Sequence, residues 1–353
     1  MGMVMKKEDF YSLMKAVPKA ELHLHGEAVI SNKTIRQLYK SRFGKPMPKD
    51  ELESLWDYDD LPGFLASFIK IQNFFVDVND IESYFRDFGS YIEKNNIVYV
   101  ETFFSPTSLM RNGFDFHDMA TRISDGVKCA REKFNATVKV IVDVSRSFGL
   151  ENAEHNLDLV LAEKNPDIIG IGLGGDEAKG PARDYASVFQ RAKAEGLHRV
   201  AHAGETVDSW SMKDCINLLD AERIGHGISA AYDEPFMKEL AEKHYPLEVS
   251  PTSNIFTKHY VSRFEDHPFK KLYDNGCFVN LNTDDPTFFK VDLIDEYWNV
   301  YSKLNFKLDD IKKVVLNGFE AAFMSDAEKQ GYYDAVEKAW NSWFASHPDV
   351  KAC

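Results

Sequence analysis

Cysteine is scarce in this chain, and the few cysteines lie far apart. The 353 residues include four, Cys129, Cys215, Cys277 and Cys353, and no C-x-x-C pair occurs. This spacing excludes a disulfide framework and a zinc site built from thiolates. Reduced thiols are typical of proteins inside the cell, so we expect a cytoplasmic location.

Long hydrophobic runs are also missing. No stretch of eighteen apolar residues occurs, so nothing is predicted to span a membrane. The N-terminal residues contain two lysines but lack the apolar segment of a signal peptide. Both absences agree with the location expected from the cysteines.

Positive charge is the third deficit. The 42 Lys and Arg residues face 56 Asp and Glu residues, which gives a formal net charge of −14. Such a charge repels phosphate backbones and anionic lipid surfaces, so we expect neither nucleic acid nor a membrane as a partner. A small neutral or cationic substrate is not repelled.

What the chain does contain is a regular alternation of short apolar runs and helical stretches. The runs are rich in β-branched residues, end in polar residues, and cover residues 20–25, 97–106, 137–146, 168–175, 198–205, 223–228, 246–253 and 277–285. Segments between them, such as 80–94, 184–195 and 233–243, have helical periodicity. Strands alternating with helices favour a parallel sheet with right-handed crossovers.

Eight such units predict an α/β fold, a closed (β/α)8 TIM barrel, with an open doubly wound sheet as the alternative. The length suits one barrel of roughly 250 residues plus insertions. We therefore expect a single domain over residues 1–353. It has a helical insertion at 36–80, after the first strand, and a C-terminal helical tail at 308–345.

Histidine and aspartate stand at the ends of four of the predicted strands. His23 and His25 end the first, His202 lies near the end of the fifth, His226 is in the sixth, and Asp284 ends the eighth. Residues i and i+2 of a strand share a face, so His23 and His25 both point into a barrel. Alone, such a pair is either a metal site or a hydrogen-bonded core pair, and the wider set is either a metal site or a solvated barrel mouth.

The residue types favour zinc over magnesium or calcium, which prefer shells of oxygen. Three imidazoles and one carboxylate, from His23, His25, His202 and Asp284, leave a further position for water, as a catalytic zinc site requires. Zinc brings the pKa of such a water close to neutral. Three more polar side chains remain for proton transfer and charge stabilisation: Glu205, His226 and Asp285.

At this point the sequence resembles the adenosine deaminase family over most of its length. The resemblance rests on eight motifs, which follow in the family's order: PKAELHLH, LPGFLASF, VYVETFFSP, LGGDE, HAGE, GHG, LEVSPTSN and LNTDDP. The resemblance implies a metal-dependent deaminase on a TIM barrel, with one Zn²⁺ per chain.

The resemblance also implies a role for single residues. His23, His25, His202 and Asp284 match the metal ligands. Glu205 matches the acid that protonates purine N1, His226 a residue beside the attacking water, and Asp285 the group that orients and deprotonates that water and contacts the substrate. Gly175 matches a glycine whose N–H meets purine N3, while Leu61, Phe64 and Leu65 match the pocket lining.

Three positions depart from the family's pattern. Gly26 and Glu27 stand where the family usually has a bulky apolar residue and an aspartate that touches the ribose. A glutamate there is similar to the adenine deaminase branch, and Gly172 replaces a frequent aspartate. We expect Glu27 at the pocket rim, accepting a hydrogen bond from a ribose hydroxyl, with Gly26 returning the room that the longer acid takes.

Three other residues have plainer expected roles. We expect Glu177 to be a structural hydrogen-bonding group rather than a catalyst, Asn254 to be a turn residue, and Cys277 to be buried packing.

These observations predict hydrolytic deamination of adenosine, and of 2′-deoxyadenosine, to inosine and ammonia, with a purine nucleoside and water as substrates. The alternatives are a deaminase of adenine or of a modified adenine nucleoside, and a catalytically inactive binding protein on the same fold. A nucleic-acid deaminase is excluded, because those enzymes need H-x-E with P-C-x-x-C.

Overall fold

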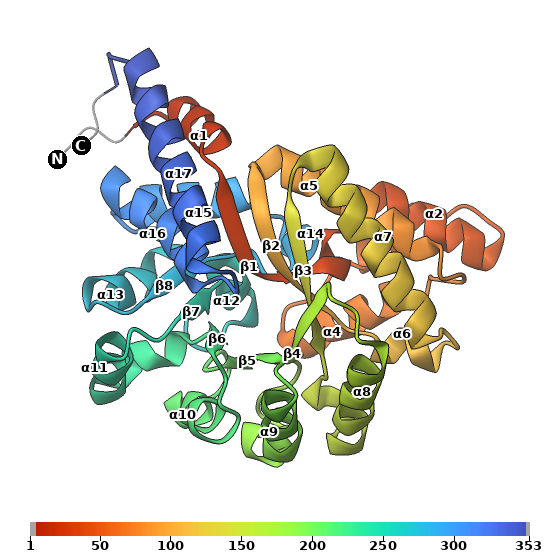
Figure 1. Ribbon diagram of the computed structural model, residues 1–353. Coiled ribbons are helices and arrows are strands. Elements are labelled where there is room, and N and C mark those ends of the chain that lie inside the picture. Colours follow the sequence, from red (N-terminus) through yellow and green to blue (C-terminus); the bar gives the residue numbers. More distant parts are fainter. Residues whose placement is uncertain (1–4, 351–353) are drawn as a thin grey trace.

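Eight parallel strands form the centre of the computed structural model, which describes residues 5–350 (Figure 1). Each strand pairs with the next one along the chain, in the order β1 to β8. The strands are β1 (Lys19–His25), β2 (Ile97–Phe104), β3 (Thr137–Asp143), β4 (Ile168–Leu173), β5 (His198–Ala203), β6 (Arg223–His226), β7 (Leu247–Val249) and β8 (Val279–Leu281). The fold is the predicted (β/α)8 barrel.

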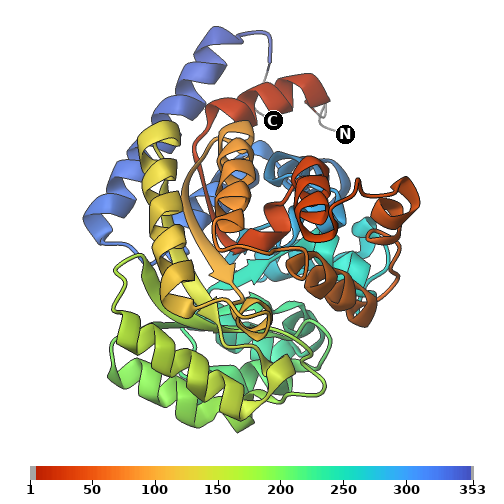
Figure 2. The same ribbon diagram turned by 90° about the vertical axis from the view of Figure 1, so that its right-hand side faces the viewer.

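Helices surround the strands in both views (Figures 1 and 2). The α-helices are α1 (Lys7–Ala16), α2 (Asn32–Phe43), α3 (Lys49–Ser54), α4 (Leu61–Gln72), α5 (Asp80–Asn95), α6 (Thr107–Arg111), α7 (Phe116–Phe134), α8 (Leu150–Glu163), α9 (Ala186–Ala194), α10 (Ser209–Leu218), α11 (Glu234–Glu242), α12 (Pro251–Thr257), α13 (Phe269–Asp274), α14 (Pro286–Phe289), α15 (Leu293–Lys303), α16 (Leu308–Ala321) and α17 (Asp326–Ser346). Short 3-10 turns are η1 (Gly26–Val29), η2 (Arg146–Phe148), η3 (Ala182–Tyr185), η4 (Ile228–Tyr232) and η5 (Phe264–Asp266). No helix in this described part combines the length and apolar character needed to cross a bilayer.

Strands β2, β3 and β4 are largely apolar because both of their faces are covered. In β2, IVYVETFF, every residue except Val98 is buried, and β3 and β4 are similar. One face of each strand meets the outer helices and the other meets the barrel interior. This is why these runs show continuous hydrophobicity rather than alternation.

Two predicted strands are much longer than the observed ones. The run expected at 246–253 is a strand only over Leu247–Val249, because Pro251 begins α12. The run expected at 277–285 is a strand only over Val279–Leu281. The backbone of Asp284 has φ 67°, which places this residue in the turn after β8. His23, His25, His202 and His226 lie within β1, β5 and β6, so Asp284 reaches the site from a turn while the histidines reach it from strands.

The barrel closes between β1 and the turn after β8. Leu24 and Asp284 form a parallel bridge. The N–H of His25 donates to the carbonyl oxygen of Asp284 at 2.9 Å, and the N–H of Asp284 donates to that of His23 at 3.1 Å. The last turn of the barrel is thus joined directly to the strand that carries the two histidines.

Helices lie at both predicted extra segments, but part of the predicted tail belongs to the barrel. α2, α3 and α4 lie in the region expected as an insertion, and α5 follows as the helix that leads into β2. α16 packs on β8 and β1 and is therefore the barrel's last outer helix. Only α17 is an addition, and it packs on α16 and α1 (Figure 1). Periodicity alone does not separate a barrel helix from an appended one.

A buried ion network joins strands β2, β6 and β7. The guanidinium of Arg223, 1% exposed, pairs with Glu101 and Glu248, both fully buried. It also lies 3.7 Å from the ring centre of Phe323. Above it, Phe103, Ile141 and Val200 fill the middle of the barrel.

Removing the cation of this network should weaken the whole barrel. We expect Arg223→Leu to lower the free energy of unfolding by about 3–5 kcal/mol, because two buried carboxylates lose their counter-charge. The measurement is the urea midpoint, compared with Arg131→Leu at an exposed position of α7. Equal midpoints for the two variants would contradict a supporting role for the network.

Candidate active site

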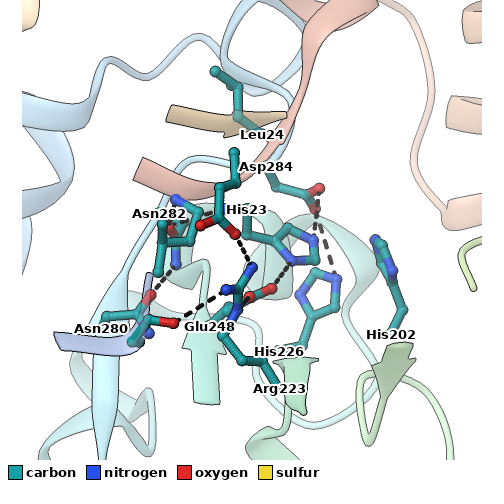
Figure 3. A network of polar contacts seen from close by, with 12 residues as sticks. His23, Leu24, His202, Arg223, His226, Glu248, Asn280, Asn282 and Asp284 are labelled. Atoms are coloured by element: carbon teal, nitrogen blue, oxygen red, sulfur yellow. Dashed lines mark hydrogen bonds and ion pairs between the residues drawn. The ribbon is translucent and has the colours of Figure 1, made fainter. Parts of the chain in front are cut away.

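Side chains from four distant parts of the sequence meet at one end of the barrel (Figure 3). The ring nitrogens Nε2 of His23 and His25 each lie 3.4 Å from Oδ1 of Asp284. Nε2 of His25 lies 3.1 Å from Nε2 of His202. His226 completes the group, with Nε2 3.8 Å from Oδ2 of Asp284. The structure therefore brings together all four predicted ligands and His226.

The chemistry of this cluster fits a metal ion. Nε2 of His23 and Oδ1 of Asp284 are buried and have no hydrogen-bond partner among the described residues. The carboxylate of Glu248 lies 2.8 Å from Nδ1 of His23, so Nδ1 carries the proton and the lone pair of Nε2 faces Asp284. Burial lowers the pKa of His23, but Asp284 and Glu248 outweigh burial and raise it to about 9, so Nε2 holds a proton until a metal ion takes its place.

The neighbouring imidazoles are neutral and can act as ligands. Burial, together with the other histidines, lowers the pKa of His202 well below its usual value. Burial also lowers the pKa of His25 to about 4. Two overlapping sets have ligand atoms close enough for one ion: His23, His202, His226 and Asp284, or His25, Asp284 and Asp285.

Two carboxyl groups beside the cluster are suited to carrying protons. Burial raises the pKa of Glu205 well above its usual range, and Asp284 and Glu177 raise it further. Burial and the adjacent Asp284 likewise raise the pKa of Asp285. Oε2 of Glu205 lies 3.6 Å from Nε2 of His226. A protonated Glu205 at this position can act as a general acid.

A cavity of about 180 Å³ opens above these groups. Its floor consists of His25, His202, His226, Glu205, Asp284 and Asp285. One wall is apolar and comes mainly from α4, with Leu61, Phe64, Leu65 and Phe68, all predicted to lie on a helix there. The rest of the lining includes polar groups, namely Gln72 at the end of α4 with Ser105, Ser108, Asp143, Ser145 and Ser147, together with Gly175.

Gly175 lies in a turn that only glycine fits. Its φ is 97°, and a Cβ there would lie 2.3 Å from the hydroxyl of Ser147. The carboxylate of Asp143 holds this turn, accepting the N–H groups of Gly174 at 2.8 Å and Ser145 at 3.0 Å. The sequence motif located the glycine but not the acid that positions it.

Glu177 anchors the turn that carries Glu205. Its carboxylate accepts the backbone N–H groups of Gly204, Glu205, Thr206 and Val207, at 2.6 to 3.2 Å. The prediction of a structural hydrogen-bonding role is confirmed. Because the charge of Glu177 also helps to keep Glu205 protonated, this anchor affects both its position and its proton.

The expectation that Glu27 lies at the pocket rim is wrong. Glu27 is 7% exposed, does not line the cavity, and lies behind Ser105 and Gln72, which do. Its Oε1 accepts the N–H of Ser105 at 2.7 Å, while Oε2 has no partner within the described chain. Burial raises its pKa to about 7. The chain folds back at η1, which turns the side chain inward.

Aromatic side chains occupy the space beside the two glycines, Gly26 and Gly172, that depart from the family's pattern. A Cβ on Gly26 would lie 1.6 Å from the hydroxyl of Tyr84, so its missing side chain does not return room to Glu27. A Cβ on Gly172 would lie 2.7 Å from the ring of Phe103. That ring packs beneath the cluster, with its centre 5.0 to 5.1 Å from those of His23, His25 and His202.

Sequence reasoning gave Asn254 too small a role. It was expected to be a turn residue, yet its side-chain amide is fully buried and contacts His226 and His267. Glu248 was not singled out at all, although a charged residue in the middle of the short strand LEV is a signal. Cys277, 4% exposed, is buried as predicted.

Comparisons with known proteins agree with this geometry. The family described as "Adenosine deaminase" matches residues 18–339. Adenine deaminase of Psychrobacter cryohalolentis is 31% identical over 93% of this chain and 98% of its own. Aminodeoxyfutalosine deaminase of Streptomyces avermitilis is 33% identical over 96% of this chain and 95% of its own. The crystal structure of adenine deaminase from Arthrobacter aurescens has a TM-score of 0.87 at 27% identity, and covers 92% of this chain and 99% of that one.

The fold and the cluster together define a metal-dependent hydrolase built on a TIM barrel. More specifically, the chain belongs to the adenosine deaminase family, and it is a hydrolytic deaminase of adenine-type substrates.

The cluster should hold about one metal ion per chain. We expect His202→Ala to lose that ion, because the remaining groups no longer surround it. Metal content by elemental analysis is the measurement, and His244→Ala, at an exposed histidine on the outer surface, is the control. Full metal occupancy in His202→Ala would remove His202 from the ligand set.

Proposed function

We propose that this protein is a zinc-dependent adenosine deaminase that converts adenosine, and 2′-deoxyadenosine, to inosine and ammonia. The observation that carries the proposal is the cavity floor, where a buried acid and a cluster with unpaired ligand atoms lie side by side. An acid and a metal site in contact are what hydrolytic removal of an amino group from a purine needs.

Zinc is proposed because of the donor set. Imidazole nitrogens with one carboxylate suit zinc, whereas magnesium and calcium prefer oxygen ligands. His23, His25, His202 and Asp284 are the proposed ligands. When bound, the ion lowers the pKa of a water molecule and polarises it for attack.

The chain's own residues then divide the remaining work. Glu205, held protonated by burial, donates a proton to purine N1, which makes C6 electrophilic. Asp285 accepts a proton from the attacking water, and His226 stabilises the charge that develops on its oxygen. Gly175 offers its N–H to purine N3. The apolar wall of Leu61, Phe64 and Leu65 packs on the purine ring and excludes water.

The polar part of the cavity lining supports a nucleoside over a free base. Ser105, Ser108, Ser145 and Ser147 and the amide of Gln72 line the cavity, and Ser108 and Ser145 are buried. A ribose offers hydroxyls that can pair with these groups, whereas a free base offers none. The second candidate is deamination of adenine, because adenine deaminases are among the relatives. A modified adenine nucleoside is the third.

One screen separates these candidates. The ultraviolet absorbance change on deamination is followed for adenine, adenosine, 2′-deoxyadenosine and a set of 5′-modified adenosines, with the zinc-loaded protein. The highest kcat/KM should belong to adenosine. If adenine is used faster than every nucleoside, the adenine deaminase assignment replaces the proposal.

Glu205→Gln tests the general acid. The amide keeps the shape but has no proton to transfer, so kcat should fall at least about a hundredfold with the metal retained. In the wild type, activity should fall as pH rises through the raised pKa of Glu205, because the protonated form is the active one. The Gln variant should lack this alkaline loss. Glu195→Gln, at the exposed end of α9, is the control, and a normal rate for Glu205→Gln would exclude Glu205.

Glu27 tests whether the support behind Ser105 matters for catalysis. Glu27 does not line the cavity, and its Oε1 accepts the N–H of Ser105, so Glu27→Ala should lower kcat/KM for adenosine and for adenine by similar factors. Glu27→Gln keeps an acceptor for the N–H of Ser105 and should therefore lose less activity than Glu27→Ala. A loss confined to adenosine would contradict this supporting role and indicate direct contact with the ribose.

A further inference from the structure

We propose that Asn254 and His267 are positioning residues that fix the tautomer of His226, so that its Nε2 carries a proton and donates a hydrogen bond into the active site. The role in catalysis rests on the function proposed above, while the tautomer itself is a property of this chain. The argument follows a chain of hydrogen bonds from the start of α13 to the cavity floor.

The chain of hydrogen bonds begins at a backbone group that can only donate. The N–H of Phe269, at the first residue of α13, lies 3.1 Å from Nδ1 of His267. Helices leave their first N–H groups without internal partners, so this donor is free to bond outward. Nδ1 of His267 must therefore accept.

His267 then has a single arrangement left. It is 3% exposed, and burial lowers its pKa to about 3, so the ring is neutral and carries one proton. Because Nδ1 accepts, the proton lies on Nε2. Nε2 is 3.2 Å from Oδ1 of Asn254, and an N–H needs an oxygen to receive it. This contact fixes which way the amide of Asn254 faces.

The NH₂ end of the Asn254 amide determines which ring nitrogen of His226 carries the proton. With Oδ1 turned to His267, the NH₂ group of Asn254 lies 3.1 Å from Nδ1 of His226 and can only donate to it. An imidazole whose Nδ1 accepts a hydrogen bond keeps its proton on Nε2. Nε2 of His226 faces Glu205 and Asp284. All three side chains are at most 3% exposed, so water does not compete.

His23 and His226 carry their ring protons on different nitrogens. His23 donates from Nδ1 to Glu248, so its Nε2 presents a lone pair to the cluster. His226 accepts at Nδ1 from Asn254, so its Nε2 presents a hydrogen. Two imidazoles in the same cluster are thus set to opposite roles by their outer partners: His23 as a ligand, and His226 as a donor to the oxygen of the attacking water. Of the two overlapping metal sets, the one that includes His226 is disfavoured.

Nitrogen NMR of the metal-loaded enzyme tests the tautomer directly. In protein labelled with ¹⁵N-histidine, couplings between ring nitrogens and ring carbon-bound hydrogens distinguish a protonated Nε2 from a protonated Nδ1. The signals of His226 are assigned as those that vanish in His226→Gln. A protonated Nε2 with a bare Nδ1 is expected in the wild type. A protonated Nδ1, or a metal-bound Nε2, would overturn the proposal.

Asn254→Asp should reverse the tautomer with almost no change in shape. A carboxylate only accepts, so it accepts hydrogen bonds from Nε2 of His267 and from Nδ1 of His226, and the proton of His226 moves from Nε2 to Nδ1. We expect kcat to fall by about 10²–10³, as for the loss of one donor to a developing charge, with KM and metal content retained. Asn275→Asp, the same change at an exposed residue after α13, should alter neither spectrum nor rate.

His267→Phe repeats the test without introducing a charge. The amide of Asn254 then loses the contact that fixes its direction, so both tautomers of His226 should appear, with a smaller loss of kcat. Unchanged His226 signals in both variants would overturn the proposal, and if Asn254→Asp does not fold, the wild-type spectrum and His267→Phe decide it. A correct tautomer in a protein that deaminates no adenine compound would refute the proposed function and leave the positioning role intact.

Discussion

The backbone pairing of His23 and His25 with Asp284 is the constraint on which the rest of the site depends. Two hydrogen bonds, from the N–H of His25 and from the N–H of Asp284, join the first strand to the turn that follows the last one. Together with the bonds of Asn282 to the backbone of β1, they close the barrel, and closure brings residues some 260 positions apart within 3.4 Å of each other. Because Asp284 sits in this turn with φ 67°, its strained backbone is held by the barrel as a whole. The same backbone contacts therefore support both the stability of the fold and the geometry of the cluster.

Outer partners give each buried group in this cluster a definite state. A set of imidazoles and carboxylates packed this closely has many ways to share its protons, and most of them do not support catalysis. Glu248 sets His23, and Glu248 is in turn held by the buried guanidinium of Arg223. Asn254 sets His226. Arg223 and Glu248 do not line the cavity, yet they act on its floor through hydrogen bonds. Apolar residues at these positions would leave the proton positions of the cluster undefined.

Most of the fold and the central cluster could be predicted from the sequence, and the reasons are local. Continuous apolar runs such as IVYVETFF occur only where both strand faces are covered, so the eight strands and their order were correct. The polar residues that follow these runs gave the positions of His23, His202, His226 and Asp284. What failed depends on contacts between distant segments. The depth of Glu27 follows from the N–H of Ser105, the room at Gly26 is taken by Tyr84, and Asn254 acquires its role from His267. None of these partners is near in sequence, so no spacing or periodicity could reveal them.

The same comparison suggests why carboxylates recur behind the cavity walls. Asp143, Glu177 and Glu27 each accept at least one backbone N–H from a turn that follows a strand, and within residues 5–350 none of them forms an ion pair with a lysine or arginine. Such turns place their N–H groups inside the protein, where an unpaired donor costs about 1–3 kcal/mol. A carboxylate satisfies several of these donors at once, as Glu177 does with four, and it fixes the turn more firmly than a water molecule can. It also adds negative charge near Glu205 and Asp285, and that charge raises their pKa values. The carboxylates that shape the cavity therefore also help to keep the general acid Glu205 protonated and make Asp285 a stronger base, which links the architecture of the turns to the chemistry on the floor.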